Sequence, residues 1–124
     1  MKVLLSIKPE YVEKIFNGEK KFEYRKAIFA NKTIKSIVVY STMPVGRIVG
    51  EFTIEEILLD SPELIWAETK MYSGVKKSFF NEYFNGKTLA YAIKICNPKL
   101  YKTPIDPKMK YKSFVAPQSF KYLS

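Results

Sequence analysis

The sequence predicts an α+β fold, a small mixed β-barrel with two or three short helices covering its openings. Apolar residues form short alternating or β-branched runs, which are typical of strands, and helical spacing occurs in only a few short windows. The expected order is strand, helix and strand, then further strands, a helical insert and closing strands. No repeat or linker divides the chain, so one domain is expected over residues 1–124.

The first predicted elements are a strand, a helix and a second strand. The apolar run at residues 3–7 predicts a short strand. Pro9 suits the first helical turn, where its missing N–H is not needed, and the spacing of apolar residues at 11–16 predicts two turns of helix. Gly18 then ends the helix, and residues 20–26 alternate as a strand.

The middle of the chain is predicted to contribute the long strands of the sheet. A loop is expected over residues 27–36, followed by a β-branched central strand at 37–41 and a turn at 43–46. Residues 47–59 alternate loosely and predict one long strand or two. Gly50 is the expected position of a bulge or bend within them.

Two helices and a closing strand are predicted next. Ser61 is followed by a proline, which indicates a helix N-terminus, and a second helix is expected over residues 75–84. Residues 89–96 alternate as a half-buried strand. The body of the domain is therefore expected to end at about residue 101. The prolines beyond it predict an irregular basic tail, residues 102–124, that packs on the body.

The composition excludes several kinds of site. The chain has no histidine and a single cysteine, so an internal disulfide, a thiolate zinc site and histidine-dependent nucleophiles are excluded. We expect neither a metal nor a cofactor. The apolar runs are too short to cross a bilayer, and Lys8 interrupts the first of them before it reaches the length of a signal-peptide core. A cytoplasmic protein without membrane contact is therefore expected.

The net charge of +9 is unevenly distributed along the chain. Residues 47–70 carry six carboxylates against two basic side chains, whereas residues 94–124 carry seven lysines against Asp106 alone. A basic face suits a polyanionic partner because it steers association. A lysine-rich composition unrelated to any such partner is the alternative explanation.

The segment from Gly18 to Lys26 is the most specific feature of the sequence, because glutamates are placed among its cations. Strand alternation puts Glu23 and Arg25 on one face, and Phe22 and Tyr24 on the face toward the core. We interpret this segment as the floor of an anion-binding groove that takes RNA or a nucleotide.

Five short segments together match the pattern of a known family. They are residues 4–9, the element Gly18-x-Lys20-x-x-Glu23-x-Arg25, and residues 39–45, 48–51 and 91–93. Through these segments, which reach across the chain to about residue 101, the sequence resembles the ASCH family. These are the activating-signal-cointegrator homology domains of the PUA-like superfamily.

The resemblance implies a PUA-like barrel with a basic cleft beside the first helix and a role in binding RNA or nucleotides. It also implies two possible enzyme activities. Some members of the family deacetylate N4-acetylcytidine, and at least one relative is a ribonuclease. The amidohydrolases use a lysine that matches Lys20 and a threonine where this chain has Glu23. They also use a glutamate that Glu68 matches loosely. Because the threonine is missing, the resemblance does not by itself predict the amidohydrolase reaction.

Four charged residues are the leading candidates for ligand binding. We expect Lys8, Lys20 and Arg25 to bind the phosphates of RNA, preferably single-stranded, or of a nucleotide. Glu23 is expected to orient Arg25 or to accept a hydrogen bond from a base amine, as glutamate does with cytosine N4. The alternatives are a solvated turn lysine at position 20 and an exposed Glu23–Arg25 ion pair, worth less than about 1 kcal/mol.

Further candidates and functions remain open at this point. Ser41 and Thr42 can offer hydroxyls or N–H groups to a phosphate, or can simply cap a strand. In an enzyme acting on a nucleic-acid substrate, Lys20 and Glu23 would be the catalytic residues that share acid–base work. In a protein-interaction module, the basic face would meet an acidic partner. Residues 118–120 either close over the cleft or only pack on the body, and the oligomeric state is left open.

Overall fold

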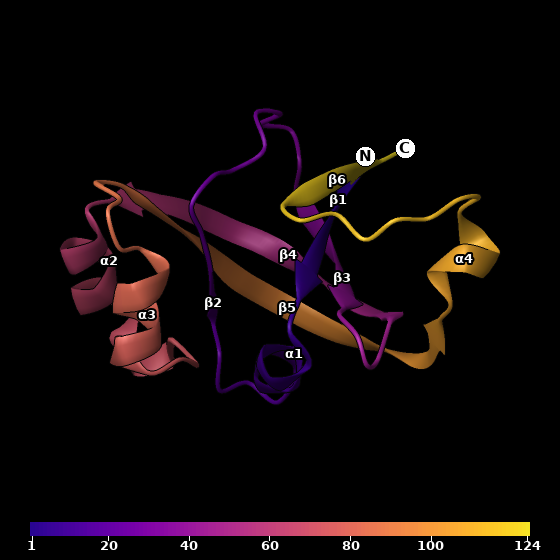
Figure 1. The fold of residues 1–124 in the computed structure, drawn as a ribbon, viewed down its shortest axis with the longest axis horizontal. Helices are drawn as coiled ribbons and strands as arrows, with labels where there is room; N and C mark the ends of the chain where they lie inside the picture. Colours follow the sequence, from indigo (N-terminus) through magenta and orange to yellow (C-terminus); the bar gives the residue numbers. More distant parts are fainter.

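The computed structural model describes residues 1–124 and contains a six-stranded mixed sheet with helices at both of its ends (Figure 1). The strands are β1 (Lys2–Ile7), β2 (Phe22–Arg25), β3 (Ser36–Ser41), β4 (Arg47–Asp60), β5 (Ala90–Ile105) and β6 (Phe120–Leu123). The helices are α1 (Pro9–Phe16), α2 (Pro62–Thr69), the 3₁₀ turn η1 (Lys70–Tyr72), α3 (Lys77–Tyr83) and α4 (Pro107–Lys110).

The strands lie in the order β2-β5-β4-β3-β1-β6, and only the β1–β3 pair is parallel. The predicted α+β class is confirmed. The sheet is not closed by backbone hydrogen bonds as the predicted barrel would be, because β2 and β6 remain as its two edges. The two termini lie together, since Lys2 of β1 pairs with Leu123 of β6 (Figure 1).

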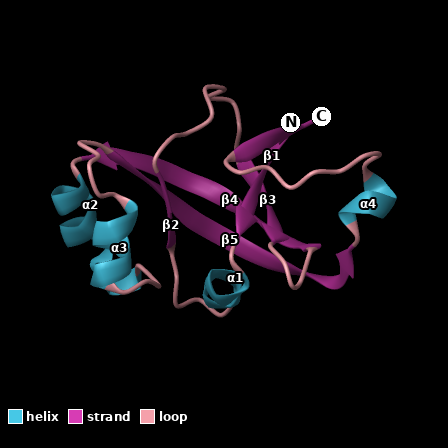
Figure 2. Cartoon of the chain, viewed as in Figure 1, coloured by secondary structure: helices cyan, strands magenta, loops and turns pink.

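Strands β4 and β5 form a long antiparallel ribbon that crosses the molecule from α2 and α3 at one end to α4 at the other (Figure 2). The bulge predicted at Gly50 is confirmed, because the β3–β4 register changes beside it. A side chain there would place its Cβ 2.5 Å from the Lys99 carbonyl oxygen and 2.6 Å from the Phe16 ring. The close approach of α1 to the ribbon therefore requires glycine at this position.

Apolar side chains cover both faces of the inner strands. Val3 and Leu5 of β1 point into the largest buried cluster, which α1 covers, whereas Leu4 points into a smaller cluster on the opposite face. Strand β3 alternates in the same way. Burial on both faces explains why these strands appear in the sequence as uninterrupted apolar runs.

The helix boundaries follow from local chemistry. Helix α1 begins at Pro9, and Gly18, with a φ of +89°, follows its end as predicted. The Ser61 hydroxyl accepts a hydrogen bond from the Leu64 N–H at 3.3 Å, so the predicted N-cap of α2 is confirmed. Helix α3 is shorter at both ends than the predicted helix over residues 75–84. None of these helices combines the length and the apolar character needed to span a membrane.

The prediction of an irregular tail over residues 102–124 is wrong for residues 102–105, 107–110 and 120–123, which form regular elements. Strand β5 continues to Ile105, α4 follows, and β6 pairs with β1. Strand β2 accompanies β5 only as far as Lys94, so Pro98 lies where one side of β5 has no partner strand. A proline is tolerated there because no ladder hydrogen bond is lost.

Candidate nucleic-acid site

A cavity of about 260 Å³ lies between the end of β1, helix α1, strand β2 and helix α3. Four of the predicted site residues line it, namely Lys8, Lys20, Glu23 and Arg25. The helix-to-strand turn after Gly18 places Lys20 at one side of the cavity. The pleat of β2 then brings Glu23 and Arg25 to the same space. The Gly-x-Lys-x-x-Glu-x-Arg element thus delivers its three charged side chains to one place.

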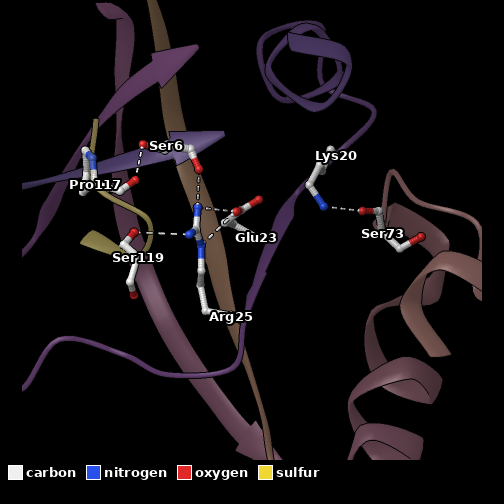
Figure 3. A network of polar contacts seen from close by, with 7 residues as sticks. All are labelled: Ser6, Lys20, Glu23, Arg25, Ser73, Pro117 and Ser119. Carbon is white, nitrogen blue, oxygen red and sulfur yellow. Dashed lines mark hydrogen bonds and ion pairs between the residues drawn. The ribbon is translucent and has the colours of Figure 1, made fainter. Parts of the chain in front are cut away.

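Lys20 is a buried lysine and not a solvated turn residue, with only 2% of its surface exposed. Its Nζ donates a 2.7 Å hydrogen bond to the Ser73 carbonyl oxygen (Figure 3). The ammonium also lies 4.8 Å from the ring centre of Tyr24 and 5.7 Å from that of Tyr11. Two aromatic faces and one carbonyl therefore stabilise a charge that has left water.

Burial lowers the pKa of Lys20 to about 8, because desolvation disfavours the charged ammonium. The negative charge of Glu23 opposes this shift, and the positive charges of Lys14 and Arg25 add to it. No carboxylate lies within ion-pair distance of the Lys20 Nζ. The side chain is therefore a proton donor near neutral pH, and it gives up its proton more readily than an ordinary lysine.

Glu23 and Arg25 form a buried ion pair, which corrects the exposed pair considered from the sequence. The Arg25 Nη2 lies 2.9 Å from Glu23 Oε2, and the two side chains are only 11% and 10% exposed. The Arg25 Nε also donates to the same oxygen at 3.1 Å. Removing one partner of such a pair leaves an uncompensated charge and costs about 3–5 kcal/mol, well above the value for exposed pairs.

The remaining N–H groups of Arg25 hold two separate parts of the chain (Figure 3). Nη2 donates to the Ser6 carbonyl oxygen of β1 at 2.9 Å, and Nη1 donates to the Ser119 carbonyl oxygen at 3.3 Å. The Ser6 hydroxyl in turn donates to the Pro117 carbonyl oxygen at 2.7 Å. These bonds fix residues 117–119, the C-terminal strap, beside the cavity, and Gln118 of the strap lines it. Both alternatives for residues 118–120 hold in part, because Gln118 lies at the cavity and Phe120 packs against the core.

Aromatic rings form the opposite wall of the cavity. Tyr11 of α1 lies with its ring centre 5.5 Å from that of Phe79 of α3, and Phe79 stacks on Tyr83 with an interplanar angle of 14°. Burial raises the pKa of Tyr24 to about 12 and also raises the pKa of Tyr83. Both phenols are therefore neutral at physiological pH. The wall offers flat apolar faces, which suit the faces of a nucleobase.

Three other candidates lie outside the cavity. Ser41 is buried at the end of β3, where it pairs with Ile7 of β1. The Thr42 N–H donates a hydrogen bond to the Ile7 carbonyl oxygen, and the Thr42 carbonyl oxygen accepts from the N–H groups of the turn that follows. Glu68 is exposed on α2 and does not line the space that holds Glu23. The described residues contain no cluster of three or more His, Cys, Asp or Glu side chains placed to hold a metal ion.

The sequence did not identify the residues that complete the cavity. Among these are Ser6, Tyr11, Phe79 and Tyr83, whereas Gln118 belongs to residues 118–120, which the sequence did single out. Tyr11, Phe79 and Tyr83 occur at helical spacing and so appear in the sequence as ordinary core residues. Spacing alone did not mark them, because Phe80 and Phe84 have the same spacing and are buried core residues.

This chain is similar to known proteins over most of its length. The ASCH domain family matches residues 5–99. Large ribosomal subunit protein uL22 of Ureaplasma parvum serovar 3 is 28% identical over 122 residues, which are 98% of this chain and 39% of that protein. This chain thus spans about two fifths of the length of uL22. An ASCH domain-containing ribonuclease of Zymomonas mobilis is 26% identical over 89 residues, which are 72% of this chain and 60% of that protein.

Solved structures are similar to the fold over nearly its full length. The crystal structure of ASCH from Zymomonas mobilis superposes with a TM-score of 0.92 at 25% identity. The superposition covers 99% of this chain and 87% of that one.

Proposed function

Since this chain belongs to the ASCH domain family, we propose that it binds RNA or a nucleotide and that the cavity around Lys20 receives one unpaired base. The similarity to a protein named as an ASCH domain-containing ribonuclease supports a nucleic-acid ligand. The cavity volume of about 260 Å³ suits a single nucleobase and not a helical segment.

The observation that carries this proposal is a donor and an acceptor facing the same aromatic cavity. Glu23 Oε1 has no hydrogen-bond partner in the protein, since Arg25 uses only Oε2. The Lys20 ammonium has three N–H donors and uses one of them on Ser73. A base with an exocyclic amine beside a ring acceptor matches this pair, and cytosine presents both groups on one edge.

We expect Glu23→Gln to remove the preference for cytosine. Glutamine keeps the shape of glutamate but presents an amide in place of a charged acceptor. The discrimination between a central cytosine and a central uracil in a short oligoribonucleotide should therefore fall by about 1–3 kcal/mol. Fluorescence anisotropy with the two oligonucleotides measures the ratio of their dissociation constants.

Thermal unfolding of the variant is the control, because the Glu23–Arg25 pair is buried. If the variant does not fold, Tyr11→Ala tests the same cavity through loss of the base-stacking surface, with weaker binding of every oligonucleotide expected. Tighter binding of all sequences by Glu23→Gln, with an unchanged ratio, would contradict base recognition by Glu23.

Hydrolysis of a nucleic-acid substrate is the second candidate function. The lowered pKa of Lys20 and the nearby Glu23 carboxylate favour it, because they are suited to proton transfer near neutral pH. Incubation with N4-acetylcytidine and with short RNA, followed by chromatography, tests both reactions. We expect no cytidine from N4-acetylcytidine, because Glu23 stands where the amidohydrolases use a threonine. If the natural chain turns over either substrate and Lys20→Ala abolishes that turnover, the protein is an enzyme and not only a binding module.

A further inference from the structure

We propose that the ligand of this cavity is a phosphodiester-linked strand whose backbone is held outside the cavity by Lys8 and Lys26. The inference rests on the proposed function and deepens it by naming the ligand as a polynucleotide and not a free nucleoside. It assigns a role to Lys26, and it moves phosphate binding away from Lys20 and Arg25.

Of the three cations that line the cavity, Lys20 and Arg25 are already engaged by the protein. The Arg25 guanidinium donates to Glu23 and to the carbonyl oxygens of Ser6 and Ser119. Lys20 is buried on the Ser73 carbonyl. A phosphate entering the cavity would have to displace these acceptors and would meet the Glu23 carboxylate. The interior therefore suits a neutral base, and the charged backbone has to remain outside.

The rim carries two cations with no carboxylate partner. Lys8 follows β1 directly, and Lys26 follows β2 directly. Both side chains are exposed, and neither lies within ion-pair distance of an acidic group. The residue after each strand thus carries one free ammonium. Lys8 lines the cavity, and Lys26 lies over the ring of Tyr83, which also lines it.

Both lysines lie over the aromatic rings of α3. Lys8 Nζ is 5.7 Å from the ring centre of Phe79, and Lys26 Nζ is 4.5 Å from that of Tyr83. The two rings are one helical turn apart, with centres separated by 6.0 Å and planes inclined by 14°. Phe79 and Tyr83 form an aromatic ledge within the wall of the cavity, with one lysine over each ring.

This arrangement combines the two features that bind single strands. The inserted base can contact the aromatic wall of the cavity, and Lys8 and Lys26 can contact the flanking phosphates. A free nucleoside could use the cavity but not the rim. Binding of a strand should therefore depend on salt, and binding of a nucleoside should not, because only phosphate contacts release counterions.

The test compares a pentaribonucleotide that has one central cytosine with cytidine alone. Isothermal titration at several salt concentrations gives the slope of log K against log [salt] for each ligand. For the pentanucleotide we expect a slope of about −1.4, or about −0.7 for each of two phosphate contacts. Lys8→Gln and Lys26→Gln should each reduce that slope to about −0.7.

Lys32→Gln is the matched control. It removes the same charge from an exposed lysine in the loop between β2 and β3, so the slope should not change. If cytidine binds but both rim variants keep the slope of the natural chain, the rim assignment is wrong and the proposed function stands. If the natural chain binds neither ligand, the proposed function itself fails, and the rim assignment fails with it.

Discussion

The buried ammonium of Lys20 gives the stability of the fold a defined pH dependence. Its pKa in the folded chain is about 8, below the ordinary value of 10.5 that applies once the chain unfolds. Between these two values the unfolded state holds a proton that the folded state has released. The free energy of unfolding therefore increases with pH across this window, and the cost of burying the charge is fully present below pH 8.

Lys20→Met tests this dependence, because methionine fills similar space without a titratable group. We expect the stability of the natural chain relative to this variant to rise by up to about 1.4 kcal/mol per pH unit between the two pKa values. Urea unfolding at a series of pH values measures the difference. Lys32→Met, at an exposed lysine, should give a difference that does not change with pH. If the stability difference between the natural chain and Lys20→Met does not change with pH, the pKa of Lys20 is not lowered in the folded chain.

At the same scale, the sequence identified the charged residues of the cavity but not their burial. Lys8, Lys20, Glu23 and Arg25, which the sequence drew from one motif and one strand end, all line the same cavity. The alternation of β2 assumes that one face of the strand is in water, and that assumption fails here. The strap covers the Glu23–Arg25 face, and α2 and α3 cover the other. Such coverage depends on distant segments, which local patterns do not contain.

Among the elements, the strap is held by two side chains, Ser6 through the Pro117 carbonyl oxygen and Arg25 through the Ser119 carbonyl oxygen. Arg25→Lys should loosen it, because a lysine has no planar fork with which to bind Glu23, Ser6 and Ser119 together. We expect faster hydrogen exchange at the amides of residues 117–123 in the variant, measured by mass spectrometry. Arg47→Lys is the matched control, since the Arg47 guanidinium bonds only the neighbouring Gly46 carbonyl. Equal exchange in the two variants would contradict the role of Arg25.

The predicted elements were correct where a local signal exists. The proline and glycine around α1, the serine before α2 and the glycine bulge in β4 each act through backbone geometry that the residue itself determines. The second half of β5 and all of β6 were missed. Their strand conformation comes from pairing with β4 and with β1, and the prolines nearby suggested the opposite.

Across the whole molecule, side-chain hydrogen bonds connect strands that the backbone ladders of the sheet do not join. The edge strand β2 is joined through Arg25 to β1 and to the residue that precedes β6. The sequence therefore predicted the mixed class correctly but described the closure as a barrel of strands. The pattern of apolar residues along each strand is the same in a barrel closed by backbone hydrogen bonds and in an open sheet whose strands are bridged by one guanidinium. The sequence pattern therefore does not distinguish the two.

The paired termini lead to a prediction for the molecule as a whole. A circular permutant that joins Ser124 to Met1 by a short flexible linker, with new ends between Lys87 and Thr88, should keep the fold. The cut lies in an exposed connection between α3 and β5, so we expect a loss of less than about 2 kcal/mol in the free energy of unfolding. Urea denaturation measures it. A permutant opened between Val38 and Val39, inside the buried β3, should not fold.

The same pairing of β1 with β6 has a consequence for protein architecture. A unit whose chain enters and leaves at one point can interrupt a surface loop of a host protein without separating the two sides of that loop. Insertion of the unit into such a loop should therefore leave its fold intact. The cavity would travel with it unchanged, because every residue that forms it lies between the two points of attachment.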